Sequence, residues 1–144
     1  MNKPLKILVI ILSAGFLIGA VAVYYIFNKP HRNINLETAA YSINAQSFFV
    51  EFSNHKALSN KKYVDRVVQV TGTIAELFVD DTQVSIVLYN SNKGVNCELD
   101  EITIAQNRQM VKALKVGDEI TLKGKCDGFD VIMGVVLTQC FIVR

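Results

Sequence analysis

A long apolar run near the N-terminus constrains this chain more than any other feature of its sequence. The run extends from Ile7 to Phe27, and Ser13, Gly15 and Gly19 are its only members that are not apolar. As a helix, its 21 residues span about 31 Å at about 1.5 Å per residue, which matches the roughly 30 Å hydrocarbon core of a bilayer. The sequence therefore predicts one helix that contacts the lipid bilayer and crosses it.

The residues around this run give a weak signal for its orientation. Tyr24 and Tyr25 occupy its C-terminal end, where amphipathic rings favour the headgroup level, and Lys29-Pro30 is expected to end the helix. Basic residues flank the run on both sides, at Lys3, Lys6, Lys29 and Arg32. The N-terminal side also carries the α-amine. By a small margin, the positive-inside rule favours a cytoplasmic N-terminus and a domain that faces outward.

A cleaved signal peptide is the competing interpretation of the N-terminus, because Ala20-Val21-Ala22 resembles a cleavage site. The apolar run continues for five residues beyond Ala22 and is longer than the apolar core of a typical signal. No cysteine follows it closely, since the first is Cys97, which argues against lipoprotein processing. We therefore expect residues 1–32 to be an uncleaved signal-anchor with its flanks.

The charges of the chain are unevenly distributed. The whole sequence has 15 basic and 13 acidic residues, but the four basic residues that flank the apolar run leave 11 against 13 from Asn33 onward, a net −2. From Tyr63 to Arg144 the count is 8 basic against 11 acidic, a net −3. A nucleic-acid-binding domain usually carries the opposite sign. The charge of the C-terminal part therefore disfavours nucleic acid as a partner.

Residues 33–62 are polar and contain one amphipathic pattern. Apolar residues recur at i, i+3, i+4 and i+7, which is the spacing of one helical face: Ala45, Phe48, Phe49 and Phe52. Ser42 or Asn44 would cap this helix, and a second short helix is expected from Lys56 to Lys61. We interpret the phenylalanines as packing on the following domain rather than binding a partner, and the rest of the segment as spacer.

From Tyr63 onward the apolar residues alternate with a period of two, which predicts strands that are buried on one face. Gly72 lies inside the first strand, where a glycine commonly marks a bulge or a sharp bend. Three strands are expected before residue 100, separated by turns at Asp80-Asp81 and Asn90–Gly94: 68–74, 84–88 and 95–99.

A helix and two more strands complete the pattern. Asp100 can cap a helix on which Ile104, Val111 and Leu114 share a stripe. Two further strands are then expected, at 119–126 and 135–143, joined by a turn at Asp127-Gly128. Three strands, a helix and two strands is the layout of the OB-fold, a five-stranded partly open barrel. We therefore expect a mainly β fold with this barrel over residues 63–144.

Several stretches of the sequence are similar to a known family. AQSFFVEF, NKKYVDRVVQVTGTI, GVNCEL, LKVGDEITLKGKC and VVLTQC resemble the bacterial tRNA_anti-like family, a branch of the OB-fold superfamily. The resemblance covers Ala40 to Arg144 and is most specific at 63–73 and 124–140. It implies an OB barrel and often an N-terminal signal or anchor, with no established catalytic residues. The family is named after anticodon-binding domains, which is a relation of fold rather than of function.

The candidate ligand-binding residues lie on the expected face of strands two and three and in the loops around it. An OB-fold that binds nucleic acid needs aromatic platforms and a basic groove there. Phe78 and Tyr89 are the candidate platforms, although Phe78 is also expected to be partly core, and the lysines are typical of ordinary exposed positions. The full set of candidates is Phe78, Asp80, Asp81, Tyr89, Asn90, Lys93, Lys123, Lys125 and Phe129.

The three cysteines, Cys97, Cys126 and Cys140, are disulfide candidates rather than metal ligands. Their spacings of 29 and 14 residues, without a nearby histidine, are poor for zinc. Outside the cytoplasm we expect one disulfide and one free thiol. Cys97 with Cys140 is one possible pair because strands three and five are neighbours in this fold. In a cytoplasmic domain we expect all three to be reduced and buried.

The sequence offers no motif for catalysis. His31 and His55 lie outside the barrel, and we find no nucleophile–base pair, P-loop, dinucleotide fingerprint or metal-ligand cluster. Asp127 and Asp130 bracket a glycine and are explained by turn chemistry. No enzyme activity, cofactor or metal is expected.

These observations predict a non-enzymatic binding module of the bacterial envelope, single-pass in the inner membrane, with a periplasmic barrel. Its partner is expected to be a protein or an oligosaccharide, met through the loops at Asp80, Asn90 and Phe129. The alternative is a nucleic-acid-binding OB domain tethered at the cytoplasmic face. A third hypothesis is a structural subunit whose membrane helix packs through Gly15 and Gly19. The sequence does not indicate an oligomeric state.

Overall fold

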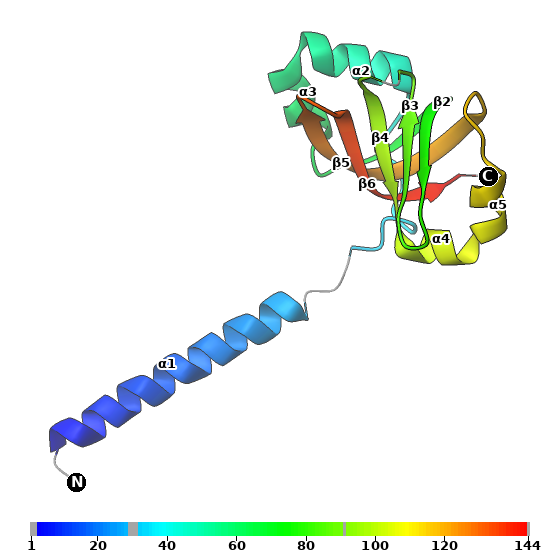
Figure 1. Ribbon diagram of the computed structural model, residues 1–144. Helices are drawn as coiled ribbons and strands as arrows, with labels where there is room; N and C mark the ends of the chain where they lie inside the picture. Colours follow the sequence, from blue (N-terminus) through cyan, green and yellow to red (C-terminus); the bar gives the residue numbers. More distant parts are fainter. Residues whose placement is uncertain (1–2, 29–31, 91, 144) are drawn as a thin grey trace. The chain divides into compact units, whose positions relative to one another are not determined.

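The computed structural model describes residues 3–28, 32–90 and 92–143. The chain divides into two compact units, Met1–Arg32 and Asn33–Arg144, which are described separately below (Figure 1). Three features of the sequence lie outside the described residues: the expected helix end at Lys29-Pro30, His31, and Ser91 of the expected turn at Asn90–Gly94.

The first unit consists of helix α1, Lys3–Phe27. Its segment Pro4–Phe27 is 24 residues long and contains an 18-residue stretch with a mean hydropathy of 2.6. Apolar side chains surround the helix on all sides and are exposed, up to 83% for Phe27. A soluble surface helix would show an apolar stripe and a polar face. The helix expected from the apolar run is therefore present, and it is long and apolar enough to cross a bilayer.

The second unit is a closed five-stranded barrel. Its strands follow the order β2-β3-β4-β6-β5, and β5 pairs again with β2 to close the barrel. Within it, β4 and β6 are parallel and the other neighbours are antiparallel. The strands are β2 Val67–Val79, β3 Val84–Leu88, β4 Gly94–Leu99, β5 Glu119–Asp130 and β6 Gly134–Ile142. With a helical segment between β4 and β5, this is the predicted OB-fold topology, which the structure confirms.

Residues expected to be spacer before the first amphipathic helix pack on the barrel instead. Ile34 is buried, and the Lys123 Nζ donates hydrogen bonds to the backbone oxygens of Asn35 and Glu37 at 2.8 and 3.1 Å. Strand β1, Tyr41–Asn44, then pairs in parallel with β2. No buried period of two marks β1, because it is a short strand at the sheet edge with mostly exposed side chains.

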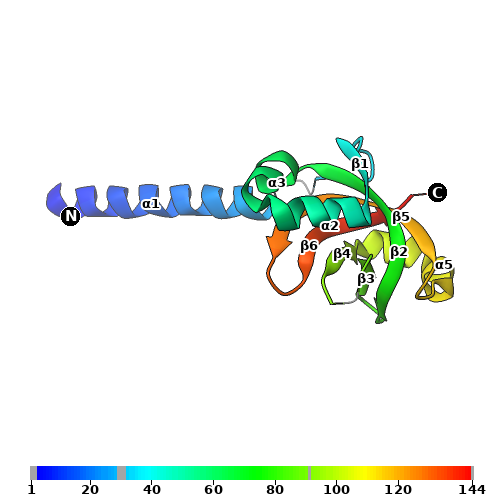
Figure 2. The ribbon, with the colours of Figure 1, turned by 90° about the horizontal axis from the view of Figure 1, so that it is seen from above.

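Two helices follow β1, and the first closes one end of the barrel. Helix α2, Ala45–Asn54, lies across the ends of the strands, and α3, Lys56–Tyr63, follows it (Figures 1 and 2). Of the two predicted caps, Asn44 caps α2, because its Oδ1 accepts from the Gln46 N–H at 2.9 Å. Phe48 and Phe52 are fully buried beneath α2, as their spacing predicted.

The opposite end of the barrel is covered by two short helices where one was expected. They are α4, Glu101–Gln106, and α5, Arg108–Ala113. Asp100 caps α4 as predicted, since its Oδ2 accepts from the Ile102 N–H at 3.1 Å. The break is at Asn107, whose Nδ2 donates to the Thr103 backbone oxygen at 3.1 Å. Such side-chain bonds compete with the helical backbone, which explains why one apolar stripe is divided between two helices.

The turn predicted at Asp127-Gly128 is wrong. Strand β5 continues to Asp130, and the turn follows at 131–133. Asp127-Gly128 forms part of a β-bulge, where the register with β6 shifts between Cys126 and Gly128 and Gly128 adopts φ of +113°. Bulges and turns both use glycine in left-handed conformations, so the sequence signal is the same for each.

Gly72 marks a close approach rather than the bulge or bend that was expected. A Cβ at Gly72 would lie 2.6 Å from the Cβ of Ala45 at the start of α2. The irregular register of β2 lies further along, between Ile74 and Glu76. The missing side chain therefore lets α2 sit directly on β2.

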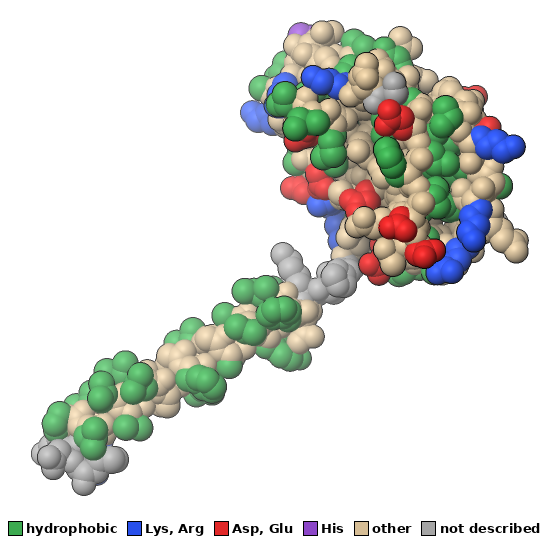
Figure 3. All heavy atoms as spheres, in the orientation of Figure 1, with side chains coloured by type: hydrophobic (Ala, Val, Ile, Leu, Met, Phe, Trp, Pro, Cys, Tyr) green, Lys and Arg blue, Asp and Glu red, His purple; other side chains and the backbone are tan. Residues whose placement is uncertain are grey.

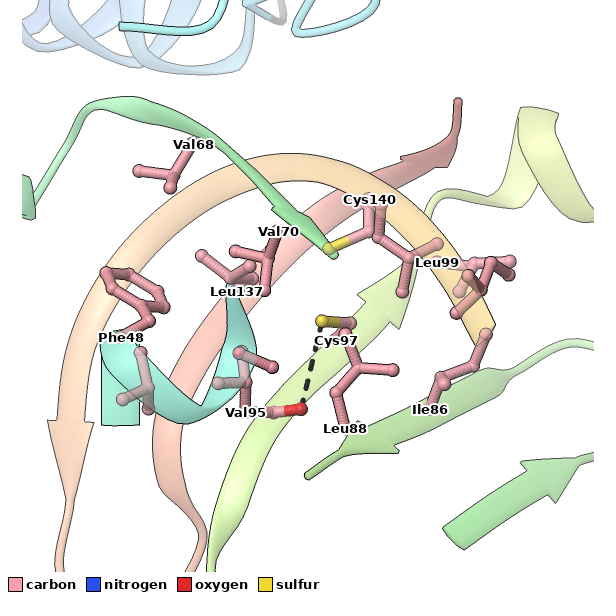
Figure 4. Packing of buried hydrophobic residues seen from close by; sticks show 14 of the residues in the cluster. Phe48, Val68, Val70, Ile86, Leu88, Val95, Cys97, Leu99, Leu137 and Cys140 are labelled. Atoms are coloured by element: carbon pink, nitrogen blue, oxygen red, sulfur yellow. Dashed lines mark hydrogen bonds between the residues drawn. The ribbon is translucent and has the colours of Figure 1, made fainter. Parts of the chain in front are cut away.

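A single apolar core fills the barrel beneath α2. Figure 4 shows Phe48 of α2, Val68 and Val70 of β2, and Leu137 of β6 around this core. These four side chains are fully buried. The outward positions of the same strands are thus the ones left for binding.

Candidate ligand-binding face

Two rows of outward-pointing side chains cross β2, β3 and β4. Phe78, Ser85 and Glu98 are aligned in one row, and Glu76, Val87 and Asn96 form the next, in which Val87 is buried. Directly paired residues in neighbouring strands place their side chains on the same side of a sheet. We call this surface the β3–β4 face and define it by Glu76, Phe78, Ser85, Val87, Asn96 and Glu98.

The centre of the β3–β4 face is built from small side chains held in fixed orientations. The Ser85 hydroxyl donates to the Asn96 Oδ1 at 2.8 Å, and the Asn96 Nδ2 donates to the Met133 sulfur at 3.7 Å. At the β2 edge, the Phe78 ring is 64% exposed. The face therefore combines an exposed aromatic ring with an ordered hydroxyl and amide, and the carboxylates of Glu76 and Glu98 flank them.

A pocket of about 260 Å³ lies at the end of this face, beside the loop that joins β2 to β3. Asp80 and Asp81 of the loop contribute acidic side chains, while Arg108 and Lys112 of α5 contribute basic ones. No ion pair joins these two groups among the described residues. Apolar residues complete the lining: Val79, Val84, Ile104 and Val111. The pocket can therefore contact both positively and negatively charged groups of a ligand.

Arg108 and Lys112 were not among the residues predicted from the sequence. Their spacing of i and i+4 places them on one side of a helix, beside the buried Val111. This i, i+4 spacing is the sequence signal from which the two basic residues could have been identified. Their proximity to Asp80 depends on the tertiary fold, which places α5 against the β2–β3 loop.

The family model for tRNA_anti-like proteins matches residues 1–142. The chain belongs to the tRNA_anti-like family. A solved lipoprotein from Klebsiella pneumoniae, described as a candidate nucleic-acid-binding protein, is similar to this tRNA_anti-like chain with 16% identity and a TM-score of 0.54. The match covers 71% of this chain and 91% of that one.

Two further solved structures are similar to part of the chain. An OBody bound to hen egg-white lysozyme has 18% identity and a TM-score of 0.46, over 58% of this chain and 86% of that one. Asparaginyl-tRNA synthetase from Pyrococcus horikoshii has 9% identity and a TM-score of 0.45, over 58% of this chain and 21% of that one. No curated protein matches the sequence. At these identities the structural likeness shows the fold alone.

Two of the three lysines predicted to contact a ligand are held by other parts of the tRNA_anti-like chain. Lys123 bonds the backbone before β1, as described above. The Lys125 Nζ lies 2.8 Å from an Asp127 carboxylate oxygen and 3.9 Å from one of Asp65. Lys93 is exposed in the turn between β3 and β4. The structure therefore does not gather the three lysines into one basic groove.

Two of the predicted aromatic or loop residues also pack within the domain. Phe129 is stacked on Phe52, with ring centroids 6.2 Å apart and an angle of 16° between the rings. Tyr89 packs on Phe49 at 5.8 Å and has a positive φ of 82°. Asn90 belongs to the β3–β4 turn, where its Oδ1 accepts from a backbone N–H at 3.2 Å. Of the nine predicted residues, Phe78, Asp80 and Asp81 border the β3–β4 face or its pocket.

The three cysteines are free and buried. Cys97 of β4 and Cys140 of β6 both project into the core (Figure 4). Burial, followed by the adjacent Cys97 thiol, raises the pKa of Cys140 well above its ordinary value. Burial raises the pKa of Cys126 to about 12, against a lowering by the Gly128 N–H. The thiols of Cys126 and Cys140 are therefore protonated at neutral pH. A Cys97–Cys140 disulfide stays a prediction for an oxidising compartment.

The described residues include no group of three or more His, Cys, Asp or Glu side chains that could hold a metal ion. The β3–β4 face presents an exposed ring, ordered hydrogen-bonding groups and carboxylates. Figure 3 shows acidic side chains gathered over β3 and β4 and toward α4, with basic ones over α5.

Proposed function

We propose that this protein is a non-enzymatic, membrane-anchored binding module of the bacterial envelope. Helix α1 crosses the inner membrane once with a cytoplasmic N-terminus, and the barrel lies in the periplasm. Its ligand, a protein or an oligosaccharide, binds the β3–β4 face and the adjoining pocket. The observation that carries this proposal is the exposed Phe78 ring beside ordered polar groups and carboxylates.

The chemistry of the face supports a protein or oligosaccharide. An exposed ring such as Phe78 stacks on the apolar side of a sugar or packs against a side chain. Ser85 and Asn96 add polar groups in fixed positions, which give orientation and specificity at little entropic cost. The carboxylates of Glu76 and Glu98 favour hydroxyl, amine and guanidinium donors in the ligand.

The same carboxylates disfavour a phosphate backbone. Nucleic-acid affinity arises largely from Lys and Arg contacts to phosphate. Glu76 and Glu98 lie on the β3–β4 face, with Asp80 and Asp81 at its end, whereas Lys123 and Lys125 are occupied by other parts of the domain. Residues 63–144 also carry a net charge of −3, the same sign as the phosphate backbone.

The exposed apolar surface of α1 supports the membrane anchor. Every large apolar side chain from Ile7 to Phe27 is about half exposed or more. Hydrocarbon is the solvent in which such a helix is stable, because its backbone polar groups are bonded internally. The slight excess of positive charge at the N-terminus supports a cytoplasmic N-terminus.

A nucleic-acid-binding module at the cytoplasmic face is the second candidate. The similar Klebsiella lipoprotein, which is described as a candidate nucleic-acid-binding protein, is the observation that favours it. Arg108, Lys112 and Lys93 are the exposed basic residues near the face that such a function would use.

Photo-crosslinking in living cells tests which ligand the face meets. A benzophenone amino acid replaces Glu98 on the face, and a matched control replaces Glu119, which is exposed at the start of β5. We expect the Glu98 position to give a discrete nuclease-resistant crosslink that the Glu119 position does not give. Phe78→Ala should weaken that crosslink by about tenfold, since truncation of an aromatic anchor commonly costs over about 1 kcal/mol. A nuclease-sensitive product, or equal products at both positions, would contradict the proposal.

A further inference from the structure

We propose that a second surface of the barrel unit docks on the bilayer that holds α1. This inference rests on the membrane anchoring of the proposed function. The surface is formed by the turn between β5 and β6 and by the neighbouring helix α3. We call it the α3–hairpin surface and define it by Lys56, Leu58, Lys61, Val131, Ile132 and Met133.

The turn between β5 and β6 presents three consecutive apolar side chains to solvent. Val131 is 67% exposed, Ile132 79% and Met133 47%. Tight turns normally carry Gly, Pro, Asn, Asp or Ser, so an apolar tip needs another explanation. An exposed apolar patch commonly marks a surface that contacts a protein or a membrane.

The tip is held in an ordered conformation. The Asp130 Oδ1 accepts hydrogen bonds from the backbone N–H groups of Ile132 and Met133, at 2.7 and 3.0 Å. These bonds lower the pKa of the Asp130 carboxyl, so the group is ionised at neutral pH. The turn is thus fixed with its apolar side chains exposed, and little order is lost when they enter another phase.

Helix α3 adds an exposed apolar residue and two lysines beside the tip. Leu58 is 69% exposed and, with Lys61 and Phe129, lines an open groove of about 770 Å³ between α3 and β5. The Lys56 Nζ lies 5.4 Å from the centre of the Phe129 ring. Figure 3 shows apolar side chains over the ends of β5 and β6, with basic side chains next to them over α3.

This combination fits a lipid surface. At a membrane interface, apolar side chains enter the boundary between headgroups and acyl chains by about 5–10 Å, and adjacent lysines contact anionic headgroups. The acidic groups nearby are engaged within the domain. Asp130 bonds its own turn, and Asp127 is paired with Lys125. The Asp130 carboxylate also interacts electrostatically with Lys56, and Lys56 and Lys61 supply the positive charge that faces the lipid phosphates.

The anchor brings a bilayer within reach of this surface. Helix α1 ends at Phe27, and Lys123 binds the barrel to the backbone of Asn35. The seven residues 28–34 can extend over at most about 25 Å. Tethering on this scale gives a high effective concentration, so even a weak affinity of the surface for lipid is sufficient.

The position of the tip agrees with this reach. Along β5, the tip lies at most about 23 Å from Lys123, because seven residues rise roughly 3.3 Å each in a straight strand and β5 is irregular. The distance from Lys123 to the tip is therefore no longer than the reach of residues 28–34. A barrel with β5 parallel to the bilayer surface can thus bring the tip to the lipid headgroups.

A fluorescent probe on the tip of the full-length protein tests the proposal. Ile132→Cys is labelled with NBD and reconstituted in phosphatidylcholine–phosphatidylglycerol vesicles. The native cysteines are fully buried and should not react. The matched control is Thr82→Cys, exposed in the β2–β3 loop. We expect blue-shifted emission at position 132 and quenching by nitroxide lipids, stronger for a nitroxide high on the acyl chain than near its end. We expect neither effect at position 82.

The outcomes separate this inference from the anchor on which it rests. Flotation of the protein with the vesicles reports whether α1 inserts into lipid. Protein that does not float would contradict the proposal that α1 is a membrane anchor. Protein that floats with an unquenched label at 132 would overturn the docking and leave the anchor intact. A blue shift without nitroxide quenching would assign the tip to a protein contact and overturn the docking as well.

A second pair of variants tests whether α3 and the tip dock as one surface. NBD is placed at Leu58→Cys, and Val131→Ser with Ile132→Ser makes the tip polar. We expect lipid quenching at position 58 to be lost. The matched control, Leu36→Ser, changes a residue that is 82% exposed outside this surface and should leave the quenching unchanged. Equal quenching in all three backgrounds would contradict docking as one surface.

Discussion

Helices α1 and α2 are both rich in apolar residues, but α1 exposes its apolar side chains whereas α2 buries one stripe of them. In α2, Phe48 and Phe52 are fully buried, while other residues of the helix face solvent. In α1, apolar side chains are exposed on all sides, with 78% of Phe16 and 83% of Phe27 accessible. The spacing of the apolar residues makes the difference. One stripe at i and i+4 fits a protein core, whereas an unbroken apolar surface fits hydrocarbon.

The comparison assigns different tasks to the two helices. The apolar core contains residues of α2 but none of α1 among the described residues. The stability of the barrel should therefore depend on α2, and α1 should decide only where the protein resides. The following predictions are ordered from the largest expected effect to the smallest.

Phe48→Ala should destabilise the barrel by about 3–5 kcal/mol, because it removes a buried aromatic ring and leaves a cavity. The ring contacts Phe52 and Tyr63, with centroids 5.3 and 5.0 Å away. Urea unfolding of the detergent-solubilised protein measures the loss. The matched control is Val50→Ala on the exposed side of α2, which should change stability by less than about 0.5 kcal/mol. Equal effects would contradict the assignment of the buried face.

Leu17→Arg should disfavour membrane insertion of α1 by about 3 kcal/mol without changing the unfolding of the barrel. Position 17 lies near the middle of the apolar segment, where an arginine is costly in hydrocarbon. The carbonate-resistant membrane fraction reports insertion, and Leu17→Ala serves as the control. If the arginine variant destabilised the barrel instead, the two helices would not have separate tasks.

Gly72→Ala should cost about 1–3 kcal/mol, because the new methyl group would overlap Ala45 and force α2 away from β2. Gly19→Ala in α1 is the matched change, since nothing lies within 4 Å of a Cβ there. The Gly19 variant should leave barrel unfolding unchanged. Ala45→Gly should recover part of the stability of the Gly72 variant, and no recovery would argue against this contact as the cause.

Glu51→Gln should cost about 1 kcal/mol at neutral pH, because it weakens the link between α2 and α3. The Glu51 carboxylate accepts from the Lys62 Nζ at 2.8 Å and from the Tyr63 hydroxyl at 2.7 Å. The side chains of Glu51 and Lys62 are partly exposed, 32% and 44%, which keeps the effect small. The bond from Lys62, and then that from Tyr63, hold the pKa of Glu51 below its ordinary value, against an opposing effect of burial.

The pH dependence of this effect has a definite sign. A carboxyl whose pKa is lower in the folded state stabilises the protein above the unfolded pKa, about 4.3 for Glu. That contribution is lost as the pH falls through the folded value. The difference between wild type and Glu51→Gln in urea unfolding should therefore shrink on acidification below about pH 4. A difference that stays constant would show that the carboxylate charge is not involved.

Local patterns in the sequence predicted most of the fold. The unbroken apolar run predicted α1, the period of two predicted the barrel strands, and the caps at Asn44 and Asp100 were readable because capping is local. The errors were local ambiguities. Gly128 carries the same signal for a bulge as for a turn, and β1 has too few buried residues to show a period.

The candidate site was less predictable, because partners distant in sequence decide it. Lys123 and Lys125 look like free surface lysines in the sequence, but the fold pairs them with the chain before β1 and with Asp127. Arg108 meets the β2–β3 loop only through the packing of α5. Phe78 was a candidate because an OB-fold that binds nucleic acid uses aromatic platforms at this face, and its role in binding stays a prediction.

The central claim is that α1 anchors the barrel on the outer side of the inner membrane, and cysteine labelling in cells tests it most directly. Cysteines introduced singly at Asn35 and Asn92 occupy exposed positions of the barrel unit, while the native cysteines are fully buried. A membrane-impermeant maleimide is applied to intact cells, spheroplasts and lysates. We predict labelling of both positions before lysis. Labelling only after lysis would place the barrel in the cytoplasm, contradict the claim and favour the tethered nucleic-acid module.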